Sequence, residues 1–487
     1  MINEDIICAI STPPGVGGIA VVRLSGEGCM AVVDKIFVSK SGKKMVDCEA
    51  NKAYFGEIYD AKNLIDEVLV TAFHDKHSYT GEESIEISCH GSLFIQQKLL
   101  QLLIRNGSRL AKPGEYTQRA FLNGKMDLSQ AEAVGDLIES ESAAAHRMAI
   151  NQMKGGFSKE LLRLRSELLE ITSLLELELD FSEEDVEFAD RKKLLEIASG
   201  IKIILKNLCE SFSLGNAIKN GIPVAIVGHS NVGKSTLLNT LLKEDKAIVS
   251  KIAGTTRDVI EDTMVINGVN FRFIDTAGIR TTTDEVENIG IERTFNRVEK
   301  AQIVLFLIDA TEKMSEEIKS YFKDVCNHLS EGSKLICVIN KCDKAPENVS
   351  LLKSSIIEMK DNISQQLETS SSSSKNDGCF NNINIVEISA KQGNNVDKLI
   401  AELMSVVNVN TLDSQSVIVS NVRHYEALSK AEVAIDRVIE GLHNMISGDF
   451  VSQDIRECLF DIAEVTGDEI TTDEVLGVIF SKFCVGK

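Results

Sequence analysis

Short runs of apolar, β-type residues alternate with turn residues over residues 6–91 of the chain. Turn residues separate five such runs: IICAIST, GIAVVRLSG, AYFGEIYD, DEVLVTAFHD and SIEISCHG. This pattern is typical of short β-strands. One stretch with helical spacing, SLFIQQKLLQLLIRNG, follows them. The sequence therefore predicts an α+β domain over residues 1–123.

The period lengthens to that of a helix beyond residue 123. Ser129 and Glu132 are expected to form a capping box near the start of this region. Apolar residues then recur at helical spacing, at Leu161, Leu164, Leu168, Ile171 and Leu175. Helical spacing returns close to the carboxyl end, in HYEALSKAEVAIDRVIEGL. We expect one helical domain in two parts, 124–218 and 411–487.

The segment between these parts alternates strands with helices. Its strand-like runs are PVAIVG, FRFIDTAG, QIVLFLIDA, KLICVIN and INIVEISA. Such alternation predicts a doubly wound α/β domain, here residues 219–410, inserted into the helical domain. A Ser-rich tract near 369–375 is expected to be a disordered surface loop, and we assign it no function. The predicted fold class is multidomain α/β.

Composition limits the class of protein and the cellular compartment that the sequence fits. The chain is 43% hydrophobic and 26% charged, as in ordinary globular proteins, and its longest apolar run, Ile303–Ile308, is too short to span a membrane. The amino terminus lacks the basic start of a secretory signal, and the eleven cysteines form no C-x-x-C pair. A net charge of −21 argues against non-specific binding of nucleic acid. We expect a cytoplasmic protein whose RNA contacts are local or shared with a partner.

The first chemical motif is Gly228-His-Ser-Asn-Val-Gly-Lys-Ser235. It follows the strand PVAIV directly and opens a helix, which is the context that a phosphate-binding P-loop requires. In that geometry backbone N–H groups surround the phosphates, Lys234 reaches the β- and γ-phosphates, and the hydroxyl of Ser235 binds Mg²⁺.

Three weaker motifs each end a later strand, at the sheet edge where α/β domains bind ligands. Asp275-Thr-Ala-Gly278 places a carboxylate near Mg²⁺. Asn340-Lys-Cys-Asp343 offers a carboxylate that matches the paired donors of guanine, and Ser389-Ala-Lys391 can support the base. Together and in this order they predict a GTP-binding domain.

Hydrolysis needs a group that orients water, and Ile279 stands where Ras-type GTPases place glutamine. Thr256 is the natural second Mg²⁺ ligand. Arg257 is either an internal arginine finger or a solvated loop charge, and the residues alone leave this open. The glycine pattern Gly15–Ala20 precedes a strand, not a helix, so we reject a dinucleotide site there. Three nearby histidines (His74, His77 and His90) lack acidic partners at metal-ligand spacing and are not expected to bind metal.

The motifs GHSNVGKS, IAGTTRD, DTAGIR, DEVENIGIER, NKCD and the terminal CVGK together resemble the tRNA uridine-modification GTPase family MnmE, also called TrmE. The segments TPPGVGGIAVVRLSG, SYTGEESIEISCHG and KPGEYTQRAFLNGKMDLSQAEAVGDLI extend the resemblance over nearly the whole chain. It implies a folate-binding amino-terminal domain that dimerises, a discontinuous helical domain and an inserted G domain.

The resemblance also implies a potassium ion in place of the arginine finger, which removes that role from Arg257. The family's potassium ligands match Asn231, Ser250, Ile252 and Thr255. The carboxylate that orients water matches Glu287, so GTP hydrolysis is expected to depend on potassium and on the dimer. The nucleotide-binding set that the motifs and the resemblance imply is Asn231, Val232, Gly233, Lys234, Ser235, Thr236, Ser250, Lys251, Ile252, Ala253, Gly254, Thr255, Thr256, Asp275, Thr276, Ala277, Gly278, Asn340, Lys341, Cys342, Asp343, Ser389, Ala390 and Lys391.

The family's folate site maps onto Arg23, Glu82, Lys125 and Lys487. The candidate catalytic residues are Glu287, Lys234 and, in the tail, Cys484. The implied reaction installs a carboxymethylaminomethyl group at C5 of the wobble uridine of certain tRNAs. A tetrahydrofolate derivative, 5-formyl- or methylene-, would carry the carbon, and an MnmG-like partner would supply FAD.

Two other classes fit less well. A GTP switch in ribosome assembly usually carries a basic RNA-binding module, which this acidic chain lacks. A lipid-anchored GTPase would need an aliphatic third position in the last four residues, and Gly486 stands there. For Cys484, a buried structural thiol is the alternative to a role in the modification.

Overall fold

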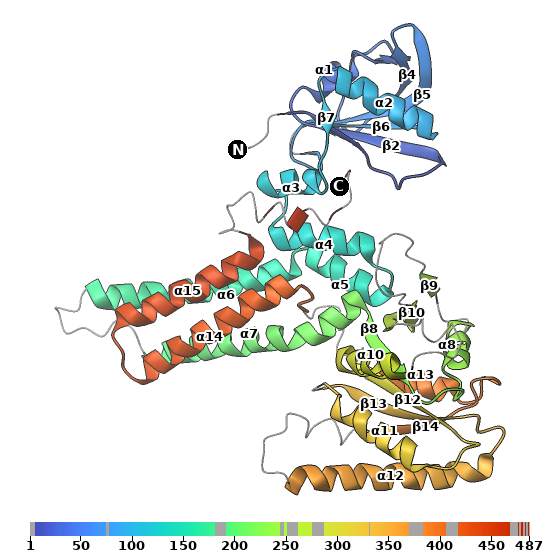
Figure 1. Cartoon of the computed structure of the whole chain (residues 1–487). Coiled ribbons are helices and arrows are strands. Elements are labelled where there is room, and N and C mark those ends of the chain that lie inside the picture. The colour runs from blue at the N-terminus through green and yellow to red at the C-terminus, as the bar shows by residue number, and fades with distance from the viewer. Residues whose placement is uncertain are drawn as a thin grey trace. The chain divides into compact units, whose positions relative to one another are not determined.

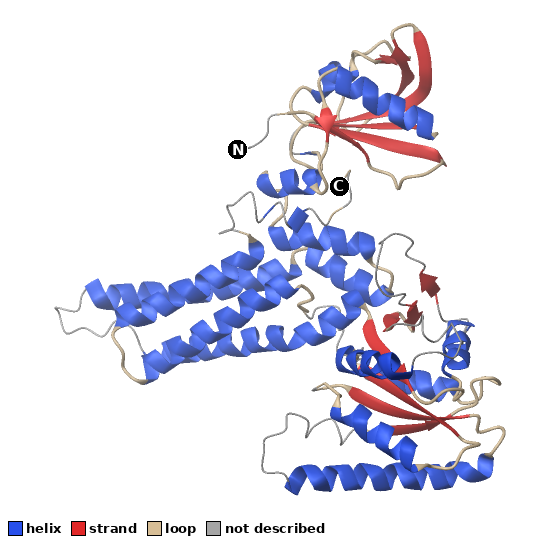
Figure 2. Cartoon of the chain, viewed as in Figure 1, coloured by secondary structure: helices blue, strands red, loops and turns tan. Residues whose placement is uncertain are grey.

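The computed structural model of the chain describes residues 5–74, 77–180, 191–243, 248–250, 262–274, 287–330, 332–369, 383–405 and 417–467, together with 476, 479, 480, 483 and 486. The chain forms two compact units, and each unit contains one seven-stranded sheet (Figure 2). The first unit comprises Met1–Ile138, Ile150–Lys206 and Glu426–Lys487, and the second comprises Glu139–Ala149 and Asn207–Tyr425.

The sheet of the first unit has the strand order β3-β4-β5-β6-β2-β1-β7. All neighbours are antiparallel except β1 and β7, which are parallel. Helix α2 (Leu93–Arg105) covers one face (Figure 1) and buries Leu99, Leu102 and Leu103 against it. The strands are β1 (Ile7–Ile10), β2 (Gly17–Ser25), β3 (Phe37–Ser39), β4 (Ala53–Asp60), β5 (Asn63–Phe73), β6 (Ser84–Gly91) and β7 (Arg109–Leu110).

Helices form the rest of the first unit, where α6 packs along α15 and an ion pair joins Lys202 of α7 to Asp436 of α14. Four of the helices, α4, α5, α7 and α14, also have residues in the second unit. The helices are α1 (Cys29–Val33), the 3₁₀ turn η1 (Met45–Asp47), α3 (Glu115–Leu122), α4 (Leu128–Glu139), α5 (Ala143–Met153), α6 (Gly156–Asp180), α7 (Arg191–Asn220), α14 (Val422–His443) and α15 (Gly448–Thr466).

The expected capping box at Ser129 and Glu132 is wrong, because α4 already begins at Leu128. The box is formed two residues earlier, by Asp127 and Gln130. The carboxylate of Asp127 accepts from the backbone N–H of Gln130 at 2.9 Å, and the side chain of Gln130 accepts from the N–H of Asp127 at 3.0 Å. Aspartate is a strong N-cap residue, and the same three-residue spacing therefore holds for a different pair.

The sheet of the second unit has the order β14-β13-β12-β8-β11-β10-β9. The five strands from β14 to β11 are parallel, and β10 and β9 extend them antiparallel. The strands are β8 (Ile222–Val227), β9 (Ile248–Ser250), β10 (Asp262–Ile266), β11 (Val269–Phe273), β12 (Ile303–Asp309), β13 (Lys334–Asn340) and β14 (Asn384–Glu387). The helices are α8 (Lys234–Lys243), α10 (Glu287–Lys300), α11 (Glu316–Asn327), α12 (Pro346–Thr369) and α13 (Val396–Ser405).

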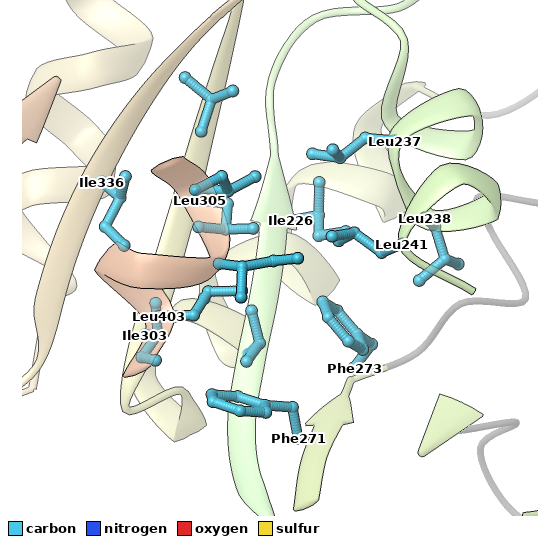
Figure 3. Packing of buried hydrophobic residues seen from close by; sticks show 14 of the residues in the cluster. Ile226, Leu237, Leu238, Leu241, Phe271, Phe273, Ile303, Leu305, Ile336 and Leu403 are labelled. Carbon is cyan, nitrogen blue, oxygen red and sulfur yellow. The ribbon is translucent and has the colours of Figure 1, made fainter. Parts of the chain in front are cut away.

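Apolar cores lie on both faces of this sheet, as the unbroken apolar runs in β12 and β13 require. On one face, Figure 3 shows Leu237 and Leu241 of α8 close to Ile226 of β8 and Phe273 of β11. On the other face, residues of α11 and α12 are buried against β12 and β13. These two layers hold the carboxyl ends of the parallel strands at one edge.

The turn between β10 and β11 is held by α5. The backbone N–H of Ala144 donates to the carbonyl of Gly268 at 3.2 Å. Ala144 and Met148 of α5 are buried with Ile218 at the end of α7. Gly268 adopts φ 82°, and a side chain there would meet Ala143.

The predicted fold class is confirmed: an α+β amino-terminal domain, a discontinuous set of helices and an inserted α/β domain are all present. Sequence patterning missed α1, β3 and β7, which are short. The Ser-rich tract lies largely outside the described residues. No helix in the described ranges is both long and apolar enough to cross a membrane.

Candidate nucleotide and cofactor sites

The P-loop joins β8 to α8 and turns through three residues in the left-handed region. Gly228, Asn231 and Gly233 have φ of 151°, 63° and 101°. The ammonium of Lys234 lies inside this loop, where it donates to the carbonyls of Gly228 at 2.5 Å and His229 at 2.8 Å. Burial, and to a lesser degree the positive charge of Arg297, lowers the pKa of Lys234. A buried cation surrounded by carbonyl groups would gain from an anion such as a nucleotide phosphate.

Asn340, the last residue of β13, connects three of the predicted motifs. Its side-chain nitrogen donates to the carbonyl of Val232 at 2.8 Å, and its side-chain oxygen accepts from the N–H of Ala390 at 3.0 Å. The amide passes so close to the P-loop that a Cβ on Gly233 would lie 2.3 Å from its nitrogen. Gly233 is therefore required both by its φ and by the space that Asn340 occupies.

Asp343 is held by two side chains of the loop after β14. Ser389 donates to one carboxylate oxygen at 2.7 Å, and Gln392 donates to the other at 3.3 Å. These hydrogen bonds hold both oxygens at the edge of the sheet, and each oxygen keeps a lone pair for a further donor such as guanine. Sequence reasoning predicted Asp343 and Ser389 but missed Gln392, which follows the S-A-K motif directly.

Two further side chains join the motifs and were also missed. Thr240 of α8 donates to the carbonyl of Ala390 at 2.7 Å, one turn and a half beyond the P-loop. Asp309, at the end of β12, accepts from the ammonium of Lys341 at 2.5 Å. Neither residue belongs to a recognisable motif, and its place at a strand or helix end was the sole available signal.

The predicted metal ligands are only partly within the described residues. Ser235 lies in the first turn of α8, next to Lys234, and Ser250 ends β9. Glu287 begins α10, with its backbone alone described. The predicted positions 251–256 and 275–278 lie outside the described residues, as do Cys484 and Lys487. Among the described side chains, no group of three or more His, Cys, Asp or Glu could hold a metal ion.

Three of the four predicted folate residues gather beside α3. Ser25 of β2 donates to Glu82 at 2.9 Å, and the stem of Lys125 would lie 3.2 Å from a Cβ on the neighbouring Gly81. Arg23 lies on the same strand as Ser25, with its guanidinium about equally far from the rings of Tyr79 and Tyr116, at 5.5 and 5.7 Å. Cations, a carboxylate and aromatic rings are suitable groups for a folate with its glutamyl carboxylates.

The charge of Arg23 is already balanced, because Glu86 accepts two hydrogen bonds from it at 2.9 and 2.7 Å. A carboxylate ligand would therefore compete with Glu86 for this guanidinium. Glu82 is similarly engaged by Arg119 at 3.0 Å. Behind them, Glu115 is 4% exposed and accepts from both Arg109 and Arg119.

The described residues of the tail lie against the amino-terminal domain and α4. Ser11 donates to the carbonyl of Gly486 at 3.2 Å. Gly486 has φ 99°, and a Cβ there would lie 2.3 Å from the carbonyl oxygen of Ile10. Phe480 is buried, and the ring of Phe483 lies 3.2 Å from the position of a Cβ on Gly135. Gly486 therefore lies beside β1, whose Ile10 pairs with Val22, the neighbour of Arg23 on β2.

One histidine has an acidic partner that the sequence did not reveal. The ring Nδ1 of His90 lies 2.7 Å from the carboxylate of Asp66, which also accepts from the backbone N–H of His90 at 2.8 Å. Asp66 sits at an irregularity between β4 and β5, so strand pairing brings together residues 24 positions apart. The expectation that no acidic partner accompanies these histidines is corrected for His90, although no third metal ligand joins the pair within the part of the chain that the structure describes.

The P-loop, the paired acceptor of Asp343 and the S-A-K loop define a P-loop domain of the GTPase class. Two family models match the chain: the "GTP-binding protein TrmE N-terminus" over residues 6–125 and the "MnmE helical domain" over residues 128–484. The chain therefore belongs to the MnmE (TrmE) family of tRNA modification GTPases, and it is a GTP-hydrolysing enzyme. The resemblance read from the motifs is confirmed.

Relatives over the full length support the same assignment. The chain is 53% identical over 486 residues to "tRNA modification GTPase MnmE" of Bacteroides fragilis, covering 100% of each chain. It is 52% identical to the protein of that name from Bacteroides thetaiotaomicron and 49% identical to that from Flavobacterium johnsoniae, again covering 100% of each chain. The solved structure of Era with MgGDPNP and ribosomal RNA aligns at 28% identity over 43% of this chain and 65% of its own, but a TM-score of 0.25 supports no argument about the fold.

Proposed function

We propose that the protein is a K⁺-dependent GTPase that, with an FAD-containing MnmG-like partner, installs a carboxymethylaminomethyl group at C5 of the wobble uridine of certain tRNAs. A tetrahydrofolate derivative would supply the carbon. The observation that carries the GTPase half is the convergence of P-loop, Asn340 and Asp343 at one sheet edge. Family membership and the gathering of Arg23, Glu82 and Lys125 support the modification half.

Within the nucleotide site, Lys234 would neutralise the phosphates, and Ser235 with Thr256 would hold Mg²⁺. Asn231, Ser250, Ile252 and Thr255 would hold K⁺, which supplies the positive charge that an arginine finger provides elsewhere. Glu287 would orient the attacking water. Asp343, held by Ser389 and Gln392, would accept from guanine.

In the first unit, Arg23 and Lys125 would bind the glutamyl carboxylates of the folate and Glu82 would face the donors of its pterin ring. Lys487 would complete this site, and Cys484 would act on the modification and not on GTP. The protein would work in the cytoplasm as a homodimer, joined to its flavoprotein partner in a heterotetramer.

The direct test is nucleoside analysis of bulk tRNA from a strain that lacks the gene, with the wild-type gene restored as control. Loss of the modified wobble uridine is expected, and an unchanged nucleoside profile would exclude a part in this modification. GTP hydrolysis is measured in parallel in KCl and in NaCl at equal ionic strength. A sharp fall in NaCl is expected, whereas equal rates would remove Asn231 from a potassium site.

Two variants separate the residue roles. Glu287→Ala should lower turnover while nucleotide affinity stays nearly intact, because a group that orients water acts on the transition state. An equal loss of affinity would assign Glu287 a structural role. Cys484→Ser should abolish the tRNA modification and spare GTP hydrolysis, and loss of both would show that the tail holds the fold.

A further inference from the structure

Asp309 is a buried carboxylate at the nucleotide edge of the sheet. It is the last residue of β12 and is aligned with Asn340, the last residue of the neighbouring parallel strand β13. Its side chain is 5% exposed. One oxygen accepts from the backbone N–H of Thr311 at 2.9 Å and from its hydroxyl at 2.8 Å. The other oxygen accepts from the ammonium of Lys341 at 2.5 Å, so both oxygens have partners.

Lys341 uses the same ammonium to bind the P-loop. It donates to the carbonyl of Asn231 at 2.7 Å, at the residue where the loop passes through φ 63°. Lys341 itself has φ 62°. The ammonium therefore joins a fixed carboxylate on β12 to a carbonyl in the P-loop. Without the Asp309 carboxylate, the long and flexible side chain of Lys341 would keep one acceptor among the described residues, the carbonyl of Asn231.

We propose that Asp309 is a positioning residue of the nucleotide site, which acts through Lys341 to hold the P-loop at Asn231 in its binding conformation. This inference deepens the proposed function. Only the experiment on potassium dependence, described last, rests on the proposed function. Burial alone would raise the pKa of Asp309, but hydrogen bonds from Lys341 and Thr311 outweigh burial and lower it, so the carboxylate is charged at neutral pH. Charge-assisted hydrogen bonds in a buried site are the strong kind.

The competing explanation is that the pair merely fastens β12 to β13. The chain offers a matched control at the opposite end of β13. Lys334, the first residue of β13, pairs with Glu402 of α13 at 3.0 Å, and the lysine side chain is 16% exposed. A structural role predicts the same consequences for loss of either pair. A positioning role predicts an effect on nucleotide binding for Asp309 alone.

The first experiment measures the Kd of a fluorescent GDP analogue with Mg²⁺ for the full chain. Asp309→Asn keeps the size of the side chain but removes its charge, and the Kd should rise about tenfold, as for loss of one charged hydrogen bond. Glu402→Gln should lower the unfolding temperature and leave the Kd unchanged. An unchanged Kd for Asp309→Asn, or an equal rise for Glu402→Gln, overturns the proposal.

The second experiment is a double-mutant cycle with Lys341→Met. If Asp309 acts through Lys341, Asp309→Asn should add almost nothing to the Kd in the Lys341→Met background. An equal fold-change in both backgrounds contradicts this route. Should Asp309→Asn fail to fold, Thr311→Val loosens the carboxylate without removing its charge, and a Kd rise of about threefold is then expected. No rise for folded Thr311→Val counts against the proposal.

The potassium arm uses the same proteins. Because Asn231 is a proposed K⁺ ligand, Asp309→Asn should raise the K⁺ concentration that gives half-maximal GTP hydrolysis, whereas Glu402→Gln should not. A wild-type protein that hydrolyses GTP equally well in NaCl overturns the proposed potassium dependence alone. In that case the Kd of the GDP analogue still decides the role of Asp309.

Discussion

Replacement of Glu115 by glutamine should loosen α3 from the amino-terminal sheet. The carboxylate is 4% exposed and accepts four hydrogen bonds: two from Arg109 at 2.8 and 2.5 Å, one from the N–H of Lys112 at 2.8 Å and one from Arg119 at 3.1 Å. Glutamine has one acceptor oxygen, and its NH₂ group would face a guanidinium. At least two charge-assisted bonds are therefore lost.

The loss of stability depends on which carboxylate partners Arg109 and Arg119 keep in Glu115→Gln. Breaking a buried ion pair typically costs roughly 3–5 kcal/mol when the remaining charge is left alone. Here Arg109 and Arg119 both keep Asp5, and Arg119 also keeps Glu82. We therefore expect about 2 kcal/mol, or roughly a thirtyfold rise in the open population of α3. Glu57→Gln, which removes the partner of Lys40 on the surface of the same domain, should have little effect.

Hydrogen exchange followed by mass spectrometry measures this opening in the full chain, through the amides of α3. The pH dependence adds a second criterion. Burial would raise the pKa of Glu115, but the bonds from Arg109, Lys112 and Arg119 prevail and lower it below the usual 4.5. Its stabilisation is thus complete above that value and is lost as the pH falls through the lower, folded pKa. The reasoning would be refuted if the free energy of opening of α3 differed between wild type and Glu115→Gln by less than about 0.5 kcal/mol at pH 7. It would also be refuted if that difference stayed constant down to about pH 3.

Three further outcomes are expected. Thr240→Val removes a 2.7 Å hydrogen bond to the S-A-K loop and should raise the Kd for GDP about tenfold, while Thr240→Ser should restore it. Gly233→Ala places a Cβ 2.3 Å from the Asn340 amide and should abolish binding of the fluorescent GDP analogue, with an unaltered circular dichroism spectrum. Gly486→Ala places a Cβ 2.3 Å from the carbonyl of Ile10 and should reduce the wobble modification measured in tRNA while GTP hydrolysis persists.

The sequence predicted most of the architecture because its periodicities are long and unambiguous. Five of the seven strands of the inserted domain coincide with the predicted apolar runs, and in the first unit β4 coincides with the run AYFGEIYD. Short elements such as β7, with two residues, carry too little pattern to be recognised. The capping box was misplaced by two residues because Asp127 and Ser129 are both good N-cap residues.

The candidate site likewise contains residues that the sequence predicted and residues that it missed. Asn340 and Asp343 are recognisable because guanine and phosphate impose fixed residue types at fixed spacings. Asp309, Gln392 and Thr240 form hydrogen bonds to other protein groups, and nothing in their local sequence marks these contacts. Strand register brings Asp309 beside Asn340, and the packing of α8 and of the loop after β14 brings in Thr240 and Gln392, so these contacts become visible only in the assembled domain.

The hairpin of β10 and β11 carries a mechanical implication. Its two strands are hydrogen-bonded along their whole length, from Asp262↔Phe273 to Ile266↔Val269. Its open end is continuous, in the chain, with the segments that include three of the six predicted metal ligands, Ile252, Thr255 and Thr256, and the predicted Asp275 carboxylate. Its closed end is held at Gly268 by Ala144 of α5. A shift of α5 would therefore act first on this hairpin, which is itself joined to the sheet through β8.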